Sequence, residues 1–256
     1  MIHIYATQNQ GARTNQEDTF LAITAATQPE SPPTHLLAAV FDGMGGLEAG
    51  DKASQAVART LKQRILEKGI HPTVVTNALR EASAAITVKN PKSGTTATVV
   101  THTPQGTQVY HAGDSRAYLL APNCPPRTLT IPHTLHHQLS TQNRLDLIPH
   151  YGGVAKAHAT LTNAIGVTCG VNVTIDTLTV TPPDCVPYWR ILLASDGFWH
   201  HLTDANLEVL ANSAWGDLPS YVDQLILVSQ TGGRPEMDNQ SIVLAHIDNP
   251  PVSARQ

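Results

Sequence analysis

The amino-acid sequence predicts an α+β fold of two mostly antiparallel β-sheets with helices on their outer faces. Short runs rich in Val, Ile, Leu and Thr recur along the chain and end at Gly, Pro or Asn, which is typical of strands. Two long helical patterns follow one another after the first of these runs, instead of alternating with strands. Because a doubly wound parallel sheet needs regular alternation, layered antiparallel sheets fit this order better.

The expected strands share β-branched or aliphatic side chains and flanking turn residues. They lie at residues 35–41, 96–103, 107–111, 116–121, 173–180, 190–194 and 241–247. The Pro-rich stretches between the expected elements, at residues 29–33, 122–126 and 182–187, are typical of surface loops.

The first expected helix covers residues 48–68, where Ala, Val, Leu and Ile recur at helical spacing and Gly69 follows as a C-terminal cap. Pro72 opens a second helix that ends near Asn90 and Pro91. Shorter helices are expected at residues 135–144, 205–212 and 218–229. We expect one domain over residues 1–248 and a disordered tail over residues 249–256.

Composition narrows the class of protein. A chain of 256 residues can bury a substantial core, and its net charge of -4 attracts neither nucleic acid nor anionic lipid. The three cysteines are widely spaced and without a CxxC pair, which argues against a disulfide framework and a thiolate zinc site. With no signal peptide pattern and no apolar run near the roughly 18 residues that cross a bilayer, we expect a cytoplasmic monomer.

Acidic residues beside apolar, strand-like runs are the most informative feature of the sequence. A carboxylate next to a buried strand is costly, and several brought together repel each other unless a cation lies between them. Oxygen ligands suit Mg²⁺, Mn²⁺ or Ca²⁺ better than zinc. The sequence therefore predicts a site for several metal ions, assembled from distant segments. The acidic residues are Glu17, Asp18, Asp42, Asp114, Asp196 and Asp238.

The segments that carry these acids resemble, in the same order, the metal-dependent serine/threonine protein phosphatases of type 2C, the PPM family. They are RTNQEDTF, FDGMGGLEAG, SGTTATVV, HAGDSRAYLL, LTNAIG, LLASDGFW and DNQSIVLAHI, and together they run from Arg13 to Ile247. One such motif alone would mean little, but coincidence does not explain all of them in order. The resemblance implies a four-layer α-β-β-α sandwich like the compact bacterial members. Its implied substrates are proteins phosphorylated by a Ser/Thr kinase.

The resemblance also implies roles for individual residues. Asp42 would bridge two catalytic ions, Mn²⁺ or Mg²⁺, and Gly43 would add its backbone carbonyl. Glu17 and Asp18 would bind one of these ions, Asp18 through a water molecule.

The other ion would be bound by Asp196 and Asp238. Asp114, together with Asp196, resembles the pair that holds a third, weaker ion in many bacterial members. Arg13 would hold the substrate phosphate, since a guanidinium matches two phosphate oxygens.

The implied reaction is hydrolysis of phosphoserine or phosphothreonine by a hydroxide that bridges the two metals, without a phosphoenzyme. Ser115 and Ser195 adjoin carboxylates, but neither lies in a GxSxG elbow, so a nucleophilic serine is not expected. Animal members carry His directly after the Asp-Gly pair, whereas Met44 stands here and has no proton to give. The proton donor to the leaving group is therefore left open.

Three alternatives stand beside this hypothesis. The chain could be an inactive relative that binds phosphoproteins, although it retains the metal carboxylates. It could be a P-loop nucleotide binder, because LLAAVF leads into GGLEAGDKAS, but Asp51 separates the last Gly from Lys52. The cluster His133, His136 and His137 contains an i,i+4 pair of histidines that could bind a zinc ion, although no third ligand for that pair is evident.

Overall fold

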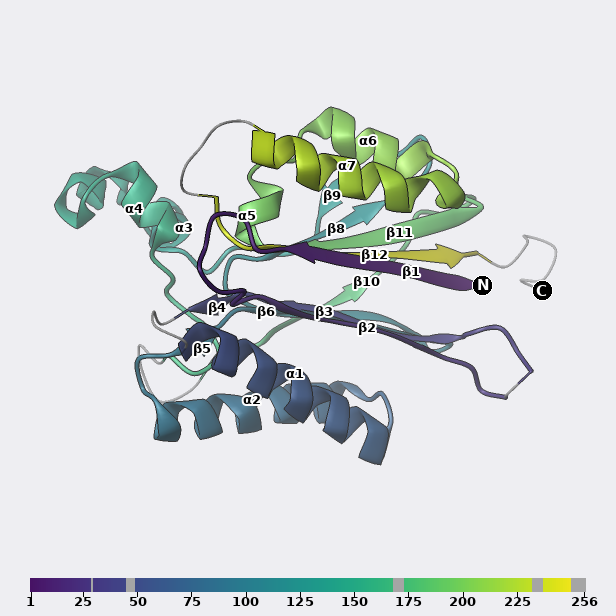
Figure 1. Cartoon of the computed structure of the whole chain (residues 1–256), viewed down its shortest axis with the longest axis horizontal. Coiled ribbons are helices and arrows are strands. Elements are labelled where there is room, and N and C mark those ends of the chain that lie inside the picture. The colour runs from purple at the N-terminus through teal and green to yellow at the C-terminus, as the bar shows by residue number, and fades with distance from the viewer. Residues whose placement is uncertain (29, 45–48, 168–172, 232–236, 250–256) are drawn as a thin grey trace.

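The structure is a computed structural model that describes residues 1–28, 30–44, 49–167, 173–231 and 237–249. Two antiparallel sheets lie face to face between two layers of helices (Figure 1), which confirms the expected four-layer α-β-β-α architecture. The first sheet runs from edge to edge through β1 (Ile2–Asn9), β12 (Gln240–Asp248), β11 (Tyr188–Ala194), β8 (Arg116–Leu120) and β9 (Arg127–Thr128). The second runs through β10 (Asp176–Val180), β7 (Gly106–Ala112), β6 (Ala97–Thr103), β3 (His35–Phe41) and β2 (Thr19–Ala25).

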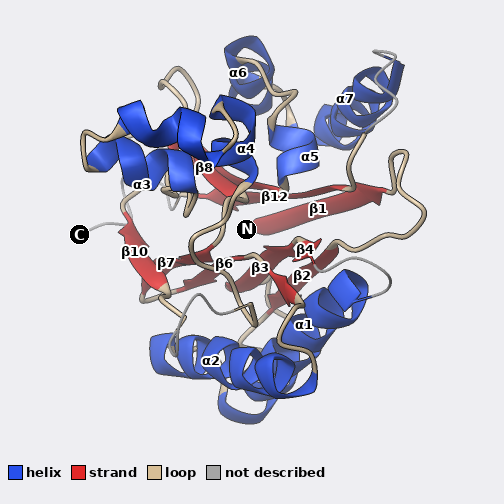
Figure 2. Ribbon diagram, turned by 90° about the vertical axis from the view of Figure 1, so that its left-hand side faces the viewer, coloured by secondary structure: helices blue, strands red, loops and turns tan. Residues whose placement is uncertain are grey.

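The helices are divided between the two outer faces. α1 (Ala49–Lys68) and α2 (Pro72–Lys89) cover the second sheet, and α6 (Asp204–Asn212) and α7 (Leu218–Thr231) cover the first (Figure 2). A small lobe at one end of the sandwich consists of α3 (Leu135–Thr141), the 3-10 helix η1 (Leu145–Tyr151) and α4 (Val154–Ala159). Short elements complete the chain: β4 (Gly43–Met44) paired with β5 (Gly94–Thr95), α5 (Asp196–Trp199) and the 3-10 helix η2 (Trp215–Asp217).

Strand β3 shows how the sequence builds the layers. Its side chains alternate between the two faces of the sheet, as the pleat of a strand requires. Leu37, Ala39 and Phe41 pack against α1 and α2, whereas Leu36 and Val40 on the other face pack against the first sheet. Both faces of the strand are therefore buried, which explains the uninterrupted apolar run HLLAAVF.

Most elements confirm the sequence-based predictions within a few residues, and the differences are local. The expected strand at 173–180 begins only at Asp176, and the helix expected to reach Arg144 ends at Thr141. Strands β1 and β2, the two-residue strands β4, β5 and β9, helices α4 and α5, and the 3-10 helices were not expected. The expected tail lies outside the described residues except for Asn249, whose backbone N–H donates to Pro187.

Candidate metal and phosphate site

The strand registers explain how acids far apart in sequence come together at one end of the sandwich. In the second sheet, Thr19 pairs with Phe41, so Asp18 and Asp42 leave the sheet side by side. In the first sheet, Ala194 pairs with both Ile242 and Arg116, so the carboxyl end of β11 meets the amino ends of β12 and β8.

Asp114 lies where the chain crosses from one sheet to the other. It is in the short connection between β7 of the second sheet and β8 of the first. Asp196 follows β11 directly, and Asp238 precedes β12. All these acids therefore stand at strand ends on the same side of the molecule.

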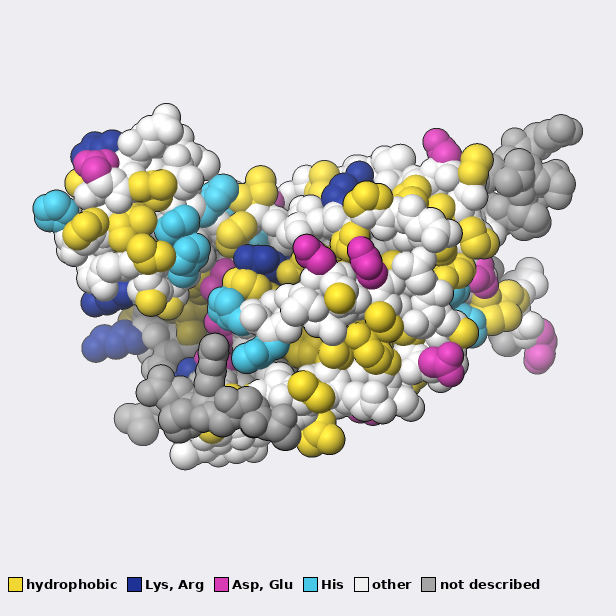
Figure 3. All heavy atoms as spheres, turned by 90° about the horizontal axis from the view of Figure 1, so that it is seen from above, with side chains coloured by type: hydrophobic (Ala, Val, Ile, Leu, Met, Phe, Trp, Pro, Cys, Tyr) yellow, Lys and Arg dark blue, Asp and Glu magenta, His cyan; other side chains and the backbone are white. Residues whose placement is uncertain are grey.

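The acids surround a cavity of about 470 Å³. Figure 3 shows acidic side chains on the floor of a hollow between the α3–α4 lobe and the body of the molecule, with histidines along its edges. The segment after α4 closes one side of this cavity. The cavity is lined by Arg13, Glu17, Asp42, Gly43, Met44, Thr96, Asp114, Ala159, Leu161, Asn163, Ala164, Val167, Asp196 and Asp238.

Asp42 is fixed through its backbone by two hydrogen bonds with Thr96. The Asp42 N–H donates to the Thr96 hydroxyl (3.0 Å), and the Thr96 N–H donates to the Asp42 carbonyl (2.8 Å). The Thr96 hydroxyl also contacts the hydroxyl of Ser115 at 2.8 Å, which ties Asp42 to the turn that carries Asp114. Ser115 is fully buried and engaged in this way, so it has a structural part rather than that of a nucleophile.

Asp18 lies behind the cavity and is 4% exposed. Neither of its carboxylate oxygens has a hydrogen-bond partner among the described residues. Burial raises the pKa of Asp18 to about 7; the hydroxyls of Ser195 and Ser241 lower it, and the charges of Asp196 and Asp238 raise it further. A buried carboxylate without donors needs either a proton or a cation.

Three further acids of the cavity also have raised pKa values. Burial, and then repulsion from Asp18, Asp196, Asp114 and Asp238, raises the pKa of Asp42 well above its usual value. Burial and the charge of Asp196 raise the pKa of Asp114 to about 7. Burial and Asp238 raise the pKa of Asp196, although a hydrogen bond with Asp42 opposes the shift. The cluster therefore has an excess of negative charge that favours a bound cation.

The rim of the cavity is tied together by Asn239. Its side-chain oxygen accepts from the Glu17 N–H at 2.8 Å, while its amide group donates to the carbonyls of Gln10 and Asn15. The loop that carries Glu17 is thereby held against the start of β12, next to Asp238.

Arg13 reaches the cavity from this loop. Its guanidinium donates to Asp238 at 2.6 Å, and this hydrogen bond raises the pKa of Arg13. About half of the Arg13 side chain (55%) is exposed, so its remaining donors are accessible to a ligand. Burial raises the pKa of Glu17, an effect that the charge of Arg13 opposes.

Gly43 is needed for the close packing under the site. A Cβ atom added there would overlap the carbonyl oxygen of Gly50 and would lie 2.5 Å from that of Glu17. No larger residue fits between β4, the start of α1 and the loop of Glu17. This close approach leaves the backbone of Gly43 in the cavity lining.

His133 holds the turn that carries Asp114. Its backbone N–H donates to the Gly113 carbonyl (2.7 Å), and its ring Nδ1 lies 3.1 Å from the Gly113 N–H. Since Nδ1 accepts this bond and one from Asn163 (3.0 Å), the ring carries its proton on Nε2, which donates to Asp176 at 3.0 Å. This histidine therefore links the turn of Asp114 to the cavity-lining Asn163 and to the edge strand β10.

The residues present fit hard divalent ions, because their donors are carboxylate oxygens that converge on one cavity, and the two oxygens of the buried Asp18 lack other partners among the described residues. Within the described ranges, no three His, Cys, Asp or Glu side chains already stand in the geometry of a metal cage. A Mg²⁺-like ion usually keeps several waters and few direct carboxylate ligands, so such a site does not need a complete cage of side chains.

The comparison with known families decides the class of protein. Residues 2–139, more than half of the chain, match the model of the family described as Protein phosphatase 2C. The chain belongs to the protein phosphatase 2C family. It is thus an enzyme, a metal-dependent serine/threonine protein phosphatase whose substrates are phosphoproteins and whose ions are Mn²⁺ or Mg²⁺, as the motifs predicted.

Solved structures agree with this assignment. The PPM Ser-Thr phosphatase MsPP from Mycobacterium smegmatis, in complex with cacodylate, is 25% identical with a TM-score of 0.72, over 97% of this chain and 98% of that one. The catalytic domain of PstP, solved with two manganese ions, is 25% identical with a TM-score of 0.71, over 97% and 99%. The S. agalactiae serine/threonine phosphatase, 20% identical with a TM-score of 0.76 over 97% and 100%, shares the fold. No curated protein sequence matches the chain.

The alternative interpretations find no support in the phosphatase structure. Asp51 lies in the first turn of α1 just before Lys52, and Gly45 and Gly46 lie outside the described residues. His133 is engaged as above, and His136 stacks on His158 at 3.8 Å, so these histidines are not arranged around a zinc ion in the described chain. None of the described helices is long and apolar enough to cross a membrane.

Proposed function

We propose that this phosphatase hydrolyses its substrates at the carboxylate cavity, with two ions bound there. The convergence of buried, mutually repelling acids on one cavity, with the oxygens of Asp18 left without partners, is the observation that carries the proposal. Such a cluster suits a pair of divalent ions, because without bound cations the repulsion among its carboxylates would destabilise the fold.

We assign the ligands by their position around the cavity. Asp42 lines the cavity and is repelled by the charges of Asp18, Asp196, Asp114 and Asp238, so it would be the ligand that both ions share. Glu17 and the Gly43 carbonyl, which line the cavity, would hold one ion, and the buried Asp18 would contribute through a water molecule. Asp196 and Asp238, at the ends of strands of the first sheet, would hold the other ion.

Asp114 completes the set at the crossing between the sheets. Its proximity to Asp196, whose charge raises its pKa, supports a third and weaker ion held by these two carboxylates. The hydrogen bonds of His133 with Gly113 orient the turn for this purpose.

When bound, the ions neutralise phosphate charge and activate a water molecule for attack on phosphorus. Arg13 orients the phosphate through donors that its contact with Asp238 leaves accessible. Because Asp238 holds the guanidinium at the rim of the cavity, the fork is positioned before substrate arrives. Met44 lines the cavity but cannot donate a proton, so the proton for the leaving alkoxide must come from a water molecule or from another residue.

We further propose that the substrates are proteins phosphorylated by a Ser/Thr kinase and that the chain acts as a cytoplasmic monomer. The net charge of -4 supports a function without nucleic-acid or membrane partners. Sedimentation at working concentration tests the monomer, and phosphoproteomics after removal of the enzyme tests the link to a kinase.

The central experiment measures binding and turnover together. Isothermal titration of chelator-treated protein with Mn²⁺ should detect more than one ion, and hydrolysis of a phosphothreonine peptide should depend on those ions. Asp42→Asn should lose tight Mn²⁺ binding, and its kcat should fall at least about a hundredfold, because the substitution removes the carboxylate that both ions would share. Asp217→Asn, on an exposed residue of η2, is the matched control and should retain both. Normal Mn²⁺ binding and turnover in Asp42→Asn would contradict the assignment.

A further inference from the structure

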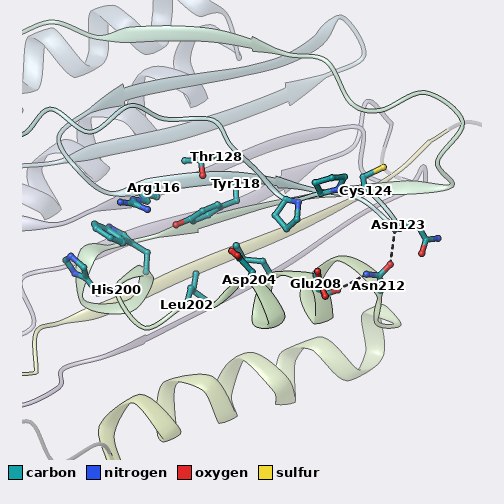
Figure 4. A pocket seen from close by; sticks show the side chains of 14 residues that line it. Arg116, Tyr118, Asn123, Cys124, Thr128, His200, Leu202, Asp204, Glu208 and Asn212 are labelled. Atoms are coloured by element: carbon teal, nitrogen blue, oxygen red, sulfur yellow. Dashed lines mark hydrogen bonds between the residues drawn. The ribbon is translucent and has the colours of Figure 1, made fainter. Parts of the chain in front are cut away.

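A second cavity, of about 910 Å³, lies beside the metal and phosphate site. We call it the α6 groove, because α6 forms one of its walls and the segment around Pro125 forms the opposite wall (Figure 4). Its floor includes the buried side chains of Tyr118 and Leu207. The groove is lined by polar, aromatic and apolar side chains and includes none of the proposed catalytic residues.

Residues at one end of the α6 groove contact the backbone of residues that line the catalytic cavity. Arg116 is two residues after Asp114, and its guanidinium carbon lies 3.5 Å from the centre of the Trp199 ring. The Trp199 indole N–H donates to the Asp114 carbonyl at 3.1 Å, and a ring nitrogen of His200 lies 2.8 Å from the Asp196 carbonyl. A substrate whose phosphate enters the catalytic cavity thus has neighbouring residues at the mouth of this groove.

The α6 wall of the groove is acidic away from Arg116. Asp204 and Glu208 are four residues apart on α6 and lie on the same side of this helix, facing the groove (Figure 4). Both are exposed, and among the described residues neither carboxylate has a hydrogen-bond or ion-pair partner. Two unpaired carboxylates on one wall of a groove attract a cationic side chain.

We propose that the α6 groove binds the segment of a phosphoprotein substrate that flanks the phosphorylated residue, and that Asp204 and Glu208 select a Lys or Arg in it. This inference rests on the proposed function. The cationic end, at Arg116, repels a basic residue placed next to the phosphorylated one. The selected Lys or Arg is therefore separated from the phosphorylated residue by the length of chain that crosses Tyr118 and Leu202.

The test uses phosphothreonine peptides in matched pairs, with Lys or Gln at one position that is moved along the peptide. At one or two positions on one side of the phosphothreonine, Lys should raise kcat/KM about two- to fivefold over Gln, as expected for an exposed charge pair. The preference should weaken at high salt, because such pairs are screened. It should be absent at positions adjacent to the phosphothreonine.

Variants locate the preference in the groove. The ratio of kcat/KM for the Lys and Gln peptides should fall to about one in the Asp204→Asn/Glu208→Gln double variant. Glu208→Lys should favour a Glu peptide over the Gln peptide. Asp217→Asn, which removes an exposed carboxylate outside the groove, should keep the wild-type ratio. Ratios within one variant cancel any change in overall activity.

A small phosphate ester separates this inference from the proposed function. If the wild-type enzyme with Mn²⁺ fails to hydrolyse para-nitrophenyl phosphate, the proposed function itself fails. If it hydrolyses the ester but shows no preference among the peptides, or prefers acidic ones, the groove inference is overturned alone. A preference that survives in the double variant overturns it as well.

Discussion

Replacing Asp18 by Asn should stabilise the metal-free protein while weakening its response to metal. Asp18 is buried with no partner for either oxygen, so in the absence of a cation its ionised form is a cost to the fold. Asn has nearly the same shape but no charge, and the hydroxyl oxygens of Ser195 and Ser241 are nearby to accept from its amide.

The magnitude follows from the pKa of Asp18, which burial raises from 3.8 to about 7. The folded protein retains a proton between these values that the unfolded chain has lost, so stability falls as pH rises through this window. A shift of about three pH units corresponds to about 4 kcal/mol at pH 8. Because protons redistribute among the interacting acids, we expect the Asp18→Asn substitution to recover about half of this free energy. That gain corresponds to a rise of about 4–8 °C in Tm for a chain of this size.

Thermal unfolding with a chelator, at pH 8 and at pH 4, measures the effect. At pH 8 the Asp18→Asn protein should melt above the wild type, and at pH 4 the difference should shrink because Asp18 is then protonated in the fold. With saturating Mn²⁺ the wild type should have the higher Tm, since it binds the ions more tightly than Asp18→Asn and is stabilised more by them. A lower Tm for the variant at pH 8 in chelator, or the same difference at both pH values, would refute the reasoning.

Two further substitutions test other parts of the site. Arg13→Ala should raise KM for a phosphopeptide about tenfold and change kcat less, because a charge-assisted contact to phosphate is lost. An unchanged KM would show that Arg13 does not bind the phosphate, even though its guanidinium contacts Asp238. Gly43→Ala should cost about 1–3 kcal/mol in chemical denaturation, because its Cβ meets the Glu17 carbonyl, whereas Gly216→Ala, with no atom within 4 Å of its Cβ, should be neutral.

The layers of the fold could be predicted because the central strands are buried on both faces. Strands such as β3 and β12 lie between a sheet and a helix layer, which requires apolar side chains at nearly every position. The missed strands β1 and β2 are edges of their sheets. Their faces are only partly buried, so polar residues dilute the pattern, as in IHIYATQN and TFLAITA.

The set of acids could also be predicted, whereas their arrangement could not. Residue types beside strand ends indicate a metal site, but only the register places Asp18 behind the cavity. The side chains of Thr96 and Asn239 hold the site through bonds to backbone atoms of other segments. Both residues lie within the family motifs, although a motif does not show which atom a side chain contacts.

The electrostatic cost of the cluster follows from the rigidity of the elements that carry it. Asp42, Asp114 and Asp196 stand at the ends of paired strands. Thr96 and Ser115 connect the ends that carry Asp42 and Asp114, and the Ser241 N–H donates to the Ser195 hydroxyl beside Asp196. The carboxylates therefore cannot separate far enough to relieve their repulsion without breaking the sheets. Protons or cations must neutralise this negative charge. Since the pKa values of Asp18 and Asp114 are about 7, protons and divalent ions compete for these carboxylates near neutral pH. A fold that holds these acids together is thus prepared to exchange protons for divalent ions near neutral pH.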